Sequence, residues 1–286
     1  MKIAHIISIV KVDKDRDLYF QQPITLETMK IAQEFARGKV EVTLVATGFP
    51  ESENLIPDYF IKAEFHKTST LEGKFKISRK LPYFSEILDT LYNAVPDADY
   101  FIQTNADIGL QPQFYLLVKK LIDDGNDSFC INKRIIPEEL NLNTIDDISV
   151  IWSTLGQFHA GHDCFVFRRE LYPLFDIGKI CMGVPWSETT LIANLITYAK
   201  NFKVFKNAHA TFHLGDRRIW LPWEYNDYRF HNCNEFAKIL EKLSKKKKKI
   251  LKHETIQYLL AKVKQEYLVY NKDENYNEEF RQYAGG

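Results

Sequence analysis

The chain has 286 residues, which is enough for one large domain or two of ordinary size. Hydrophobic residues make up 45 % of it and charged residues 27 %, a composition typical of a globular protein with a sizeable core. Lysine plus arginine equals aspartate plus glutamate at 38 residues each, so the whole molecule has no net positive field that would attract nucleic acid.

The first half of the chain alternates between strand patterns and helix patterns. Short apolar runs predict strands, and apolar residues at helical spacing predict helices. The expected strands are Ile3–Val10, Val40–Ala46, 100–103 and Phe129–Asn132, and the expected helices cover 26–35 with Thr25 as N-cap, 84–92 and 114–122. This alternation predicts an α/β fold in which helices cover both faces of a mainly parallel sheet.

The second half of the chain is less regular. Residues 137–160 show no clear periodicity and predict a loop-rich insertion. Strands are expected at Cys164–Phe167 and Phe202–Phe205, and a helix over 188–199 with Ser187 as its N-cap. The composition becomes rich in lysine from about residue 235. We therefore expect a main domain over 1–234 and a helical C-terminal extension over 235–286 that is frayed at its end.

The cysteines and the apolar stretches indicate in which cellular compartment the protein is expected. The four cysteines are widely spaced and form no Cys-x-x-Cys pair, which argues against a zinc site and favours reduced thiols. The apolar N-terminus is short and soon followed by charges, so a first strand is expected there in place of a signal peptide. No apolar run approaches the length of a membrane span. The expected location is the cytoplasm.

The most informative motif follows the expected strand at 100–103. The apolar run Tyr100-Phe101-Ile102 ends abruptly, and Asn105 and Asp107 come two residues apart directly after it. In open α/β sheets ligands bind just outside the carboxyl ends of strands, and a carboxylate there suits a divalent metal that carries phosphates. The competing interpretation is a polar turn in which Asp107 caps a helix near residue 112.

Three further motifs follow in order: Gly161-His162-Asp163, then Pro185-Trp186-Ser187-Glu188, then His213 within 210–218. With Asn105-Ala-Asp107, they make the chain resemble the GT-A glycosyltransferases of the nucleotide-diphospho-sugar transferase superfamily. Those enzymes carry an Asp-x-Asp motif at a strand end, a glycine-containing loop, an acid that opens a helix, and a C-terminal histidine that binds metal. The resemblance spans roughly residues 3–220 and rests on motif order, since each motif alone is degenerate.

The resemblance implies a role for each position. Mn²⁺ or Mg²⁺ would be held by Asp107 and His213 at the donor site, with Asn105 as a weaker oxygen donor or as a contact to the ribose. Glu188 matches the family position of the base that deprotonates the acceptor, with Asp163 as the competing candidate. Position and side-chain chemistry, apart from the resemblance, make Lys11, Arg79, Lys80, Arg217 and Arg218 candidate contacts of the donor diphosphate, and His162 and Trp186 candidate contacts of the acceptor.

The sequence departs from the family pattern at two places. Asn105 stands where the first aspartate of the motif is expected, so one negative charge is missing, metal affinity should fall, and a metal-independent enzyme becomes an alternative. No aspartate follows Glu188, which leaves the identity of the base open, and an acid in the first turn of a helix is stabilised there in any case. His213 has a rival ligand in His209, and Trp186 has the alternative of a core position.

The segment 238–252 contains eight lysines and a single acid, Glu241. Three interpretations stand: a solvated helix face, a basic amphipathic surface held against anionic lipid at the inner face of a membrane, or nucleic-acid binding. The last is disfavoured because the patch is short and no recognition motif accompanies it, so no nucleic-acid partner is expected.

The expected function is transfer of a sugar from a nucleotide-diphospho-sugar to a hydroxyl of a glycan or a lipid-linked glycan. One alternative is a nucleotidyltransferase, which is weakened because no glycine-rich phosphate loop follows the first strand. The other is a non-catalytic module that binds a sugar or a nucleotide.

Overall fold

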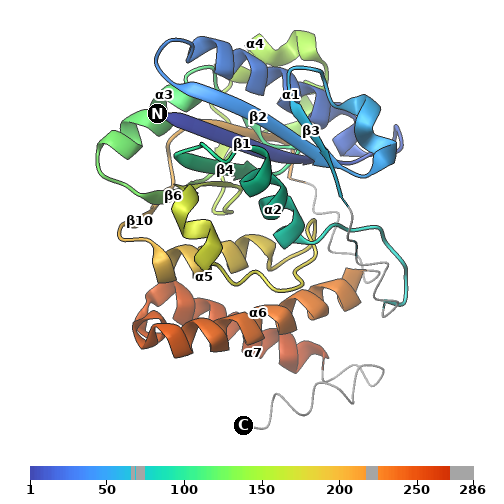
Figure 1. The fold of residues 1–286 in the computed structure, drawn as a ribbon. Helices are drawn as coiled ribbons and strands as arrows, with labels where there is room; N and C mark the ends of the chain where they lie inside the picture. The colour runs from blue at the N-terminus through green and yellow to red at the C-terminus, as the bar shows by residue number, and fades with distance from the viewer. Residues whose placement is uncertain (66–67, 69–74, 217–224, 271–286) are drawn as a thin grey trace. The chain divides into compact units, whose positions relative to one another are not determined.

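A computed structural model describes residues 1–65, 68, 75–216 and 225–270 (Figure 1). The strands in these residues are β1 (Lys2–Ile9), β2 (Glu41–Gly48), β3 (Ile61–Glu64), β4 (Tyr100–Thr104), β5 (Gly109–Leu110), β6 (Ser128–Ile131), β7 (Arg134–Ile136), β8 (Gln157–Phe158), β9 (Cys164–Arg168), β10 (Phe202–Phe205) and β11 (Thr211–Leu214). The α-helices are α1 (Asp17–Phe35), α2 (Phe84–Ala94), α3 (Phe114–Asp123), α4 (Ile148–Ser153), α5 (Ser187–Tyr198), α6 (Asn226–Lys246) and α7 (Glu254–Tyr270).

The chain folds into two compact units. Unit 1 comprises Met1–Lys67, Glu86–Leu174 and Ala199–Arg218, and unit 2 comprises Thr68–Ser85, Phe175–Tyr198 and Ile219–Gly286. The domain boundary expected after residue 234 stays a prediction. None of the helices in the described ranges is long and apolar enough to cross a bilayer.

Unit 1 is built on a seven-stranded sheet with the order β10-β6-β9-β4-β1-β2-β3. Neighbouring strands run parallel except around β9, which is antiparallel to both β4 and β6. The chain proceeds from β1 to β2 and β3 on one side and then returns to β4 on the other, which makes the β1–β4 boundary a topological switch point. The predicted α/β fold with a mainly parallel sheet is confirmed.

Helices cover both faces of this sheet (Figure 1). On one face, Ile3 and Ile7 of β1 pack in a single apolar cluster with Met29 of α1 and Phe114 of α3. On the other face, the ring of Phe101 in β4 contacts that of Tyr92 in α2. Side chains that alternate along a strand point to opposite faces, so a strand buried on both sides reads as a continuous apolar run.

Two predicted elements need correction. Helix α1 begins at Asp17, so Thr25 lies buried inside the helix and does not cap it. The first turns of α1, which were not predicted, contain Gln22. Its side chain is turned inward and hydrogen-bonds both the N–H and the carbonyl of Val10, and this polar residue interrupts the apolar periodicity. The loop-rich insertion at 137–160 contains α4 and β8, which are too short to show a period.

Unit 1 also contains a second sheet, with the order β5-β11-β7-β8. Its β5–β11 pair joins Gly109 to Phe212. A Cβ atom at residue 109 would lie 2.2 Å from Phe212 Cζ, so only glycine lets the phenylalanine ring cover this strand. Strand β11 was not predicted. It has four residues and pairs with β7, which has three, and β5, which has two, and strands this short show no clear hydrophobic pattern.

Unit 2 contains α5, α6 and α7 with the segment before α2. Tyr83, Cys181, Val184 and Tyr228 form one of its apolar clusters. Asn232 of α6 is fully buried and bonds the N–H of Cys181 and the carbonyls of Cys181 and Pro185. A single amide side chain therefore satisfies three backbone groups of the loop before α5.

Replacing Gly109 by alanine should lower the free energy of unfolding by about 1–3 kcal/mol, because the new methyl group overlaps the Phe212 ring. The same change in a Phe212→Leu background should cost clearly less, since the ring that it meets is gone. Denaturant unfolding of the four proteins in this double-mutant cycle measures the coupling. Additive losses would show that the ring is not held against Gly109.

Candidate active site

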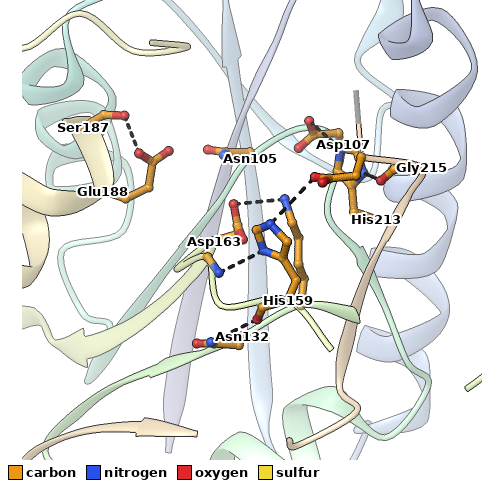
Figure 2. A network of polar contacts seen from close by, with 12 residues as sticks. Asn105, Asp107, Asn132, His159, Asp163, Ser187, Glu188, His213 and Gly215 are labelled. Carbon is orange, nitrogen blue, oxygen red and sulfur yellow. Dashed lines mark hydrogen bonds and ion pairs between the residues drawn. The ribbon is translucent and has the colours of Figure 1, made fainter. Parts of the chain in front are cut away.

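Polar residues gather where three neighbouring strands of unit 1 meet one edge of the sheet. Asn105 follows β4, Asn132 follows β6, and Asp163 precedes the antiparallel β9. Because Cys164 is paired with Thr104 on one side and with Ile131 on the other, Asp163 lies between the two asparagines (Figure 2). This edge is the carboxyl end of β1 and β4, where their switch point lies.

The centre of the site is a contact between Asp107 and His213 (Figure 2). His213 Nε2 lies 3.2 Å from Asp107 Oδ2, and the side chains are 10 % and 27 % exposed. Asp107 comes from the turn after β4 and His213 from β11, so the β5–β11 pairing brings together residues 106 positions apart. Helix α3 has Gln113 at its N-cap, so Asp107 does not cap that helix.

The hydrogen bond of the other ring nitrogen of His213, Nδ1, constrains the contact between Nε2 and Asp107. Nδ1 lies 2.7 Å from the carbonyl oxygen of Gly215, and a carbonyl only accepts, so Nδ1 carries a proton. Nε2 then faces a carboxylate oxygen. That contact is favourable when Nε2 is also protonated, or when a cation lies beside both atoms. The geometry therefore suits either a protonated imidazole that donates to Asp107 or a neutral imidazole that presents Nε2 to a cation.

The carboxyl of Asp107 is held in its charged form. Burial by itself raises the pKa of Asp107, but the charge and hydrogen bond of His213 and the charge of Lys133 outweigh it, and the pKa lies below the usual value. Asp107 Oδ1 is buried and has no hydrogen-bond partner among the described residues. A buried anionic oxygen without a donor is costly, which favours a ligand at this position.

A second buried ion pair joins Lys133 to Asp163. Lys133 Nζ lies 3.3 Å from Asp163 Oδ1, and the side chains are 10 % and 12 % exposed. Asp163 Oδ2 and Asn132 Oδ1 are buried without partners in the described part of the chain. In the loop before Asp163, a Cβ atom at residue 161 would lie 2.5 Å from His159 Cε1, so a larger residue there would displace this imidazole.

The end of β4 is supported from the core side by His5. Its Nε2 lies 2.9 Å from Thr104 Oγ1 and its Nδ1 2.9 Å from the hydroxyl of Tyr115. Burial lowers the pKa of His5 to about 3, so the imidazole is neutral at ordinary pH. A neutral ring bonded at both nitrogens fixes the strand end from which Asn105 and Asp107 project.

Other predicted residues of unit 1 lie at the same edge or outside the described chain. Lys11 follows β1, is exposed, and donates its backbone N–H to Ser52. His162 is half-buried in the loop before Asp163. The rival ligand His209 bonds Gln111, whereas His213 contacts Asp107. Arg217 and Arg218 lie outside the described residues.

The remaining predicted residues belong to unit 2. Glu188 opens α5 and accepts a hydrogen bond from Ser187 Oγ at 2.9 Å. Trp186 is 5 % exposed and stacks on Phe236 of α6, as a core residue does. Arg79 lies over the ring of Tyr225, 3.9 Å from its centroid, and Lys80 follows it.

Sequence reasoning missed Lys133 and Asn132. Asn132 ends the predicted strand Phe129–Asn132, and Lys133 follows it. Asp107 was singled out as a polar residue at the carboxyl end of a strand, and the same rule applies to these two residues. Within the described ranges, no group of three or more histidine, cysteine, aspartate or glutamate side chains is placed to hold a metal. Asp107 and His213 supply two such ligands, and Asn105 can add only a neutral oxygen.

Acid unfolding should reveal the low pKa of Asp107. A carboxyl whose pKa is lower in the folded state stabilises the fold above its ordinary pKa of about 3.9, and this contribution is lost as pH falls through the folded value. The free-energy difference between the native protein and Asp107→Asn should therefore shrink as pH falls through about 4 and below. Denaturant titrations from pH 7 downward measure it, with the exposed Asp123→Asn as control; a pH-independent difference would contradict the assignment.

Comparisons with known proteins return structures and no sequence family. No protein-family model and no curated protein matches the sequence. S. aureus TarS in complex with UDP-GlcNAc is 10 % identical with a TM-score of 0.45, over 93 % of this chain and 81 % of that one. A putative nucleotide-diphospho-sugar transferase from Desulfovibrio desulfuricans is 10 % identical with a TM-score of 0.38, over 92 % and 97 % of the two chains.

A third solved structure, 4-diphosphocytidyl-2C-methyl-D-erythritolsynthase from Anaerococcus prevotii, is 11 % identical with a TM-score of 0.40, over 80 % of this chain and 95 % of that one. Each of these TM-scores is below one half, so the role of every residue in the site rests on the geometry of this chain.

Proposed function

We propose that this chain is a glycosyltransferase that moves a sugar from a nucleotide-diphospho-sugar to a hydroxyl of a glycan or lipid-linked glycan. The observation that carries the proposal is the buried contact between Asp107 and His213 at the carboxyl edge of β4. Beside it, Asp163 lies at the same edge with an unpartnered oxygen. An anionic site with one prepared histidine suits the leaving diphosphate together with a cation.

The residues at this edge suit a divalent cation that binds with modest affinity. Asp107 and His213 would hold Mn²⁺ or Mg²⁺, with Asn105 as a neutral oxygen donor. The cation would supply charge neutralisation of the departing diphosphate. Because Asn105 carries no charge, the protein alone offers one carboxylate, so binding of the metal and of the nucleotide should strengthen each other.

Two carboxylates are proposed for the deprotonation of the acceptor. Asp163 belongs to the same unit as Asp107 and His213, and Lys133 holds its Oδ1 while Oδ2 lacks a partner. Glu188 opens α5 in unit 2, bonded to Ser187. Asp163→Asn and Glu188→Gln, compared in one assay, decide between them: the base is the residue whose loss abolishes transfer while nucleotide binding is retained.

The remaining contacts are proposed from position. Lys11 follows β1 at the edge that holds Asp107, and Arg79, Lys80, Arg217 and Arg218 are proposed for the donor's phosphates. His162 is proposed for the acceptor. The burial of Trp186 against Phe236 gives it a packing role within unit 2, so the acceptor role proposed for it requires its ring to become accessible.

Nucleotide binding should depend on metal. Thermal-shift measurements with UDP, GDP, CMP and dTDP should show stabilisation by one of them in the presence of Mn²⁺ and much less in its absence, because diphosphate and cation neutralise each other at Asp107. Asp107→Asn should remove the metal-dependent part of the shift. Stabilisation by free glycans alone would favour a binding module instead.

Transfer should also depend on Asp107. With the nucleotide sugar identified by that screen, Asp107→Asn should lower the rate of nucleoside diphosphate release by about 100-fold or more, while Asp123→Asn on the surface of α3 leaves it unchanged. Undiminished release by Asp107→Asn would refute the proposed site. Pyrophosphate release from a nucleoside triphosphate and a sugar phosphate would identify a nucleotidyltransferase.

A further inference from the structure

The lysine run of unit 2 forms the turn of a helical hairpin. Lys245 and Lys246 end α6, a short 3₁₀ turn covers Lys248–Lys252, and α7 begins at Glu254. The two helices are held side by side, as shown by the Arg229–Glu266 ion pair at 2.9 Å (Figure 1). Six of the eight residues from 245 to 252 are lysine and none is acidic, so strong positive charge is concentrated at one end of the hairpin.

The lysines of this turn divide into two kinds. Lys247 donates to the carbonyl of Thr197 at 2.6 Å, and Lys245 is paired with Glu241. Lys248, Lys249 and Lys252 are exposed, and their side chains bond no residue in the described part of the chain. Cations at a helix C-terminus offset the helix dipole, which accounts for Lys245 and not for these three.

Apolar side chains accompany the unpaired lysines. Ile250 is 4 % exposed and anchors the turn in the core of unit 2, whereas its neighbour Leu251 is 40 % exposed. The carbonyl of Leu251 accepts a hydrogen bond from the Gln257 side chain, which brings the start of α7 to the turn. The next residue, Tyr258, is 59 % exposed. A solvated lysine face has no need of an exposed leucine and tyrosine beside it.

We propose that this basic tip, consisting of Lys248, Lys249, Leu251, Lys252 and Tyr258, docks on an anionic membrane surface. Lysine clusters are attracted to anionic headgroups, and an exposed leucine and tyrosine can enter the boundary between headgroups and acyl chains. A nucleic acid would use the charges but gain little from the leucine. The inference concerns unit 2 alone and stands independently of the activity proposed for unit 1.

Vesicle sedimentation with the full chain tests the proposal. The protein should pellet with phosphatidylcholine vesicles that contain phosphatidylglycerol and stay in solution with phosphatidylcholine alone, and added salt should release it. Replacing Lys248, Lys249 and Lys252 together by glutamine should weaken the partition coefficient roughly 100-fold. Leu251→Gln should weaken it by a smaller factor, roughly fivefold.

A matched triple variant separates the tip from general charge. Glutamine at Lys39, Lys203 and Lys206, which are exposed lysines of unit 1, removes the same charge and should leave vesicle binding intact. Circular dichroism checks that both triple variants keep their helices. Equal loss in the two triples, or equal binding to neutral vesicles, would overturn the proposal. Displacement of the protein from vesicles by mixed-sequence duplex DNA at matched phosphate would assign the tip to nucleic acid instead.

Discussion

The contact between the Asp107 carboxylate and the His213 imidazole depends on the pairing of two very short strands. Strand β5 follows the Asp107 turn, and β11 carries His213, so their backbone hydrogen bonds fix the distance between the two side chains. The pairing in turn depends on Gly109, over which the ring of Phe212 lies. One glycine thus lets two strands of the small sheet pair closely, and this pairing brings Asp107 to His213.

Charge explains why the site is chemically unfinished without a ligand. Lys133 is shared between Asp163, which it contacts, and Asp107, whose pKa it helps to lower. One oxygen of each carboxylate stays buried and unpartnered in the described chain. Folded proteins rarely leave such groups without compensation, which ordered water can supply, as can a ligand that brings positive charge or hydroxyl donors. A cation with a nucleotide sugar brings both.

The basic tip of unit 2 follows different physics. The active-site edge relies on buried charges whose geometry is fixed by strands and by a neutral His5 behind them. At the tip, Lys248 and its neighbouring lysines are exposed. Their attraction to an anionic surface therefore acts at long range, is screened by salt, and does not require a fixed side-chain geometry. A buried edge suits discrimination among small ligands, whereas an exposed lysine cluster suits adhesion to an extended anionic surface.

The sequence by itself determined six of the seven strands of the large sheet, because each of those six is a largely apolar run whose pattern is local, whereas the exposed strand β3 was not predicted. It also singled out Asp107, because a polar residue abruptly ends one of those runs. Motif order also predicted His213 as a metal ligand. Only the tertiary structure decided that His213 and not His209 contacts Asp107, that Lys133 pairs with Asp163, and that Trp186 is packed against Phe236. These are contacts between residues far apart in the chain, and they depend on short strands such as β5 and β11, whose few residues carry no readable period.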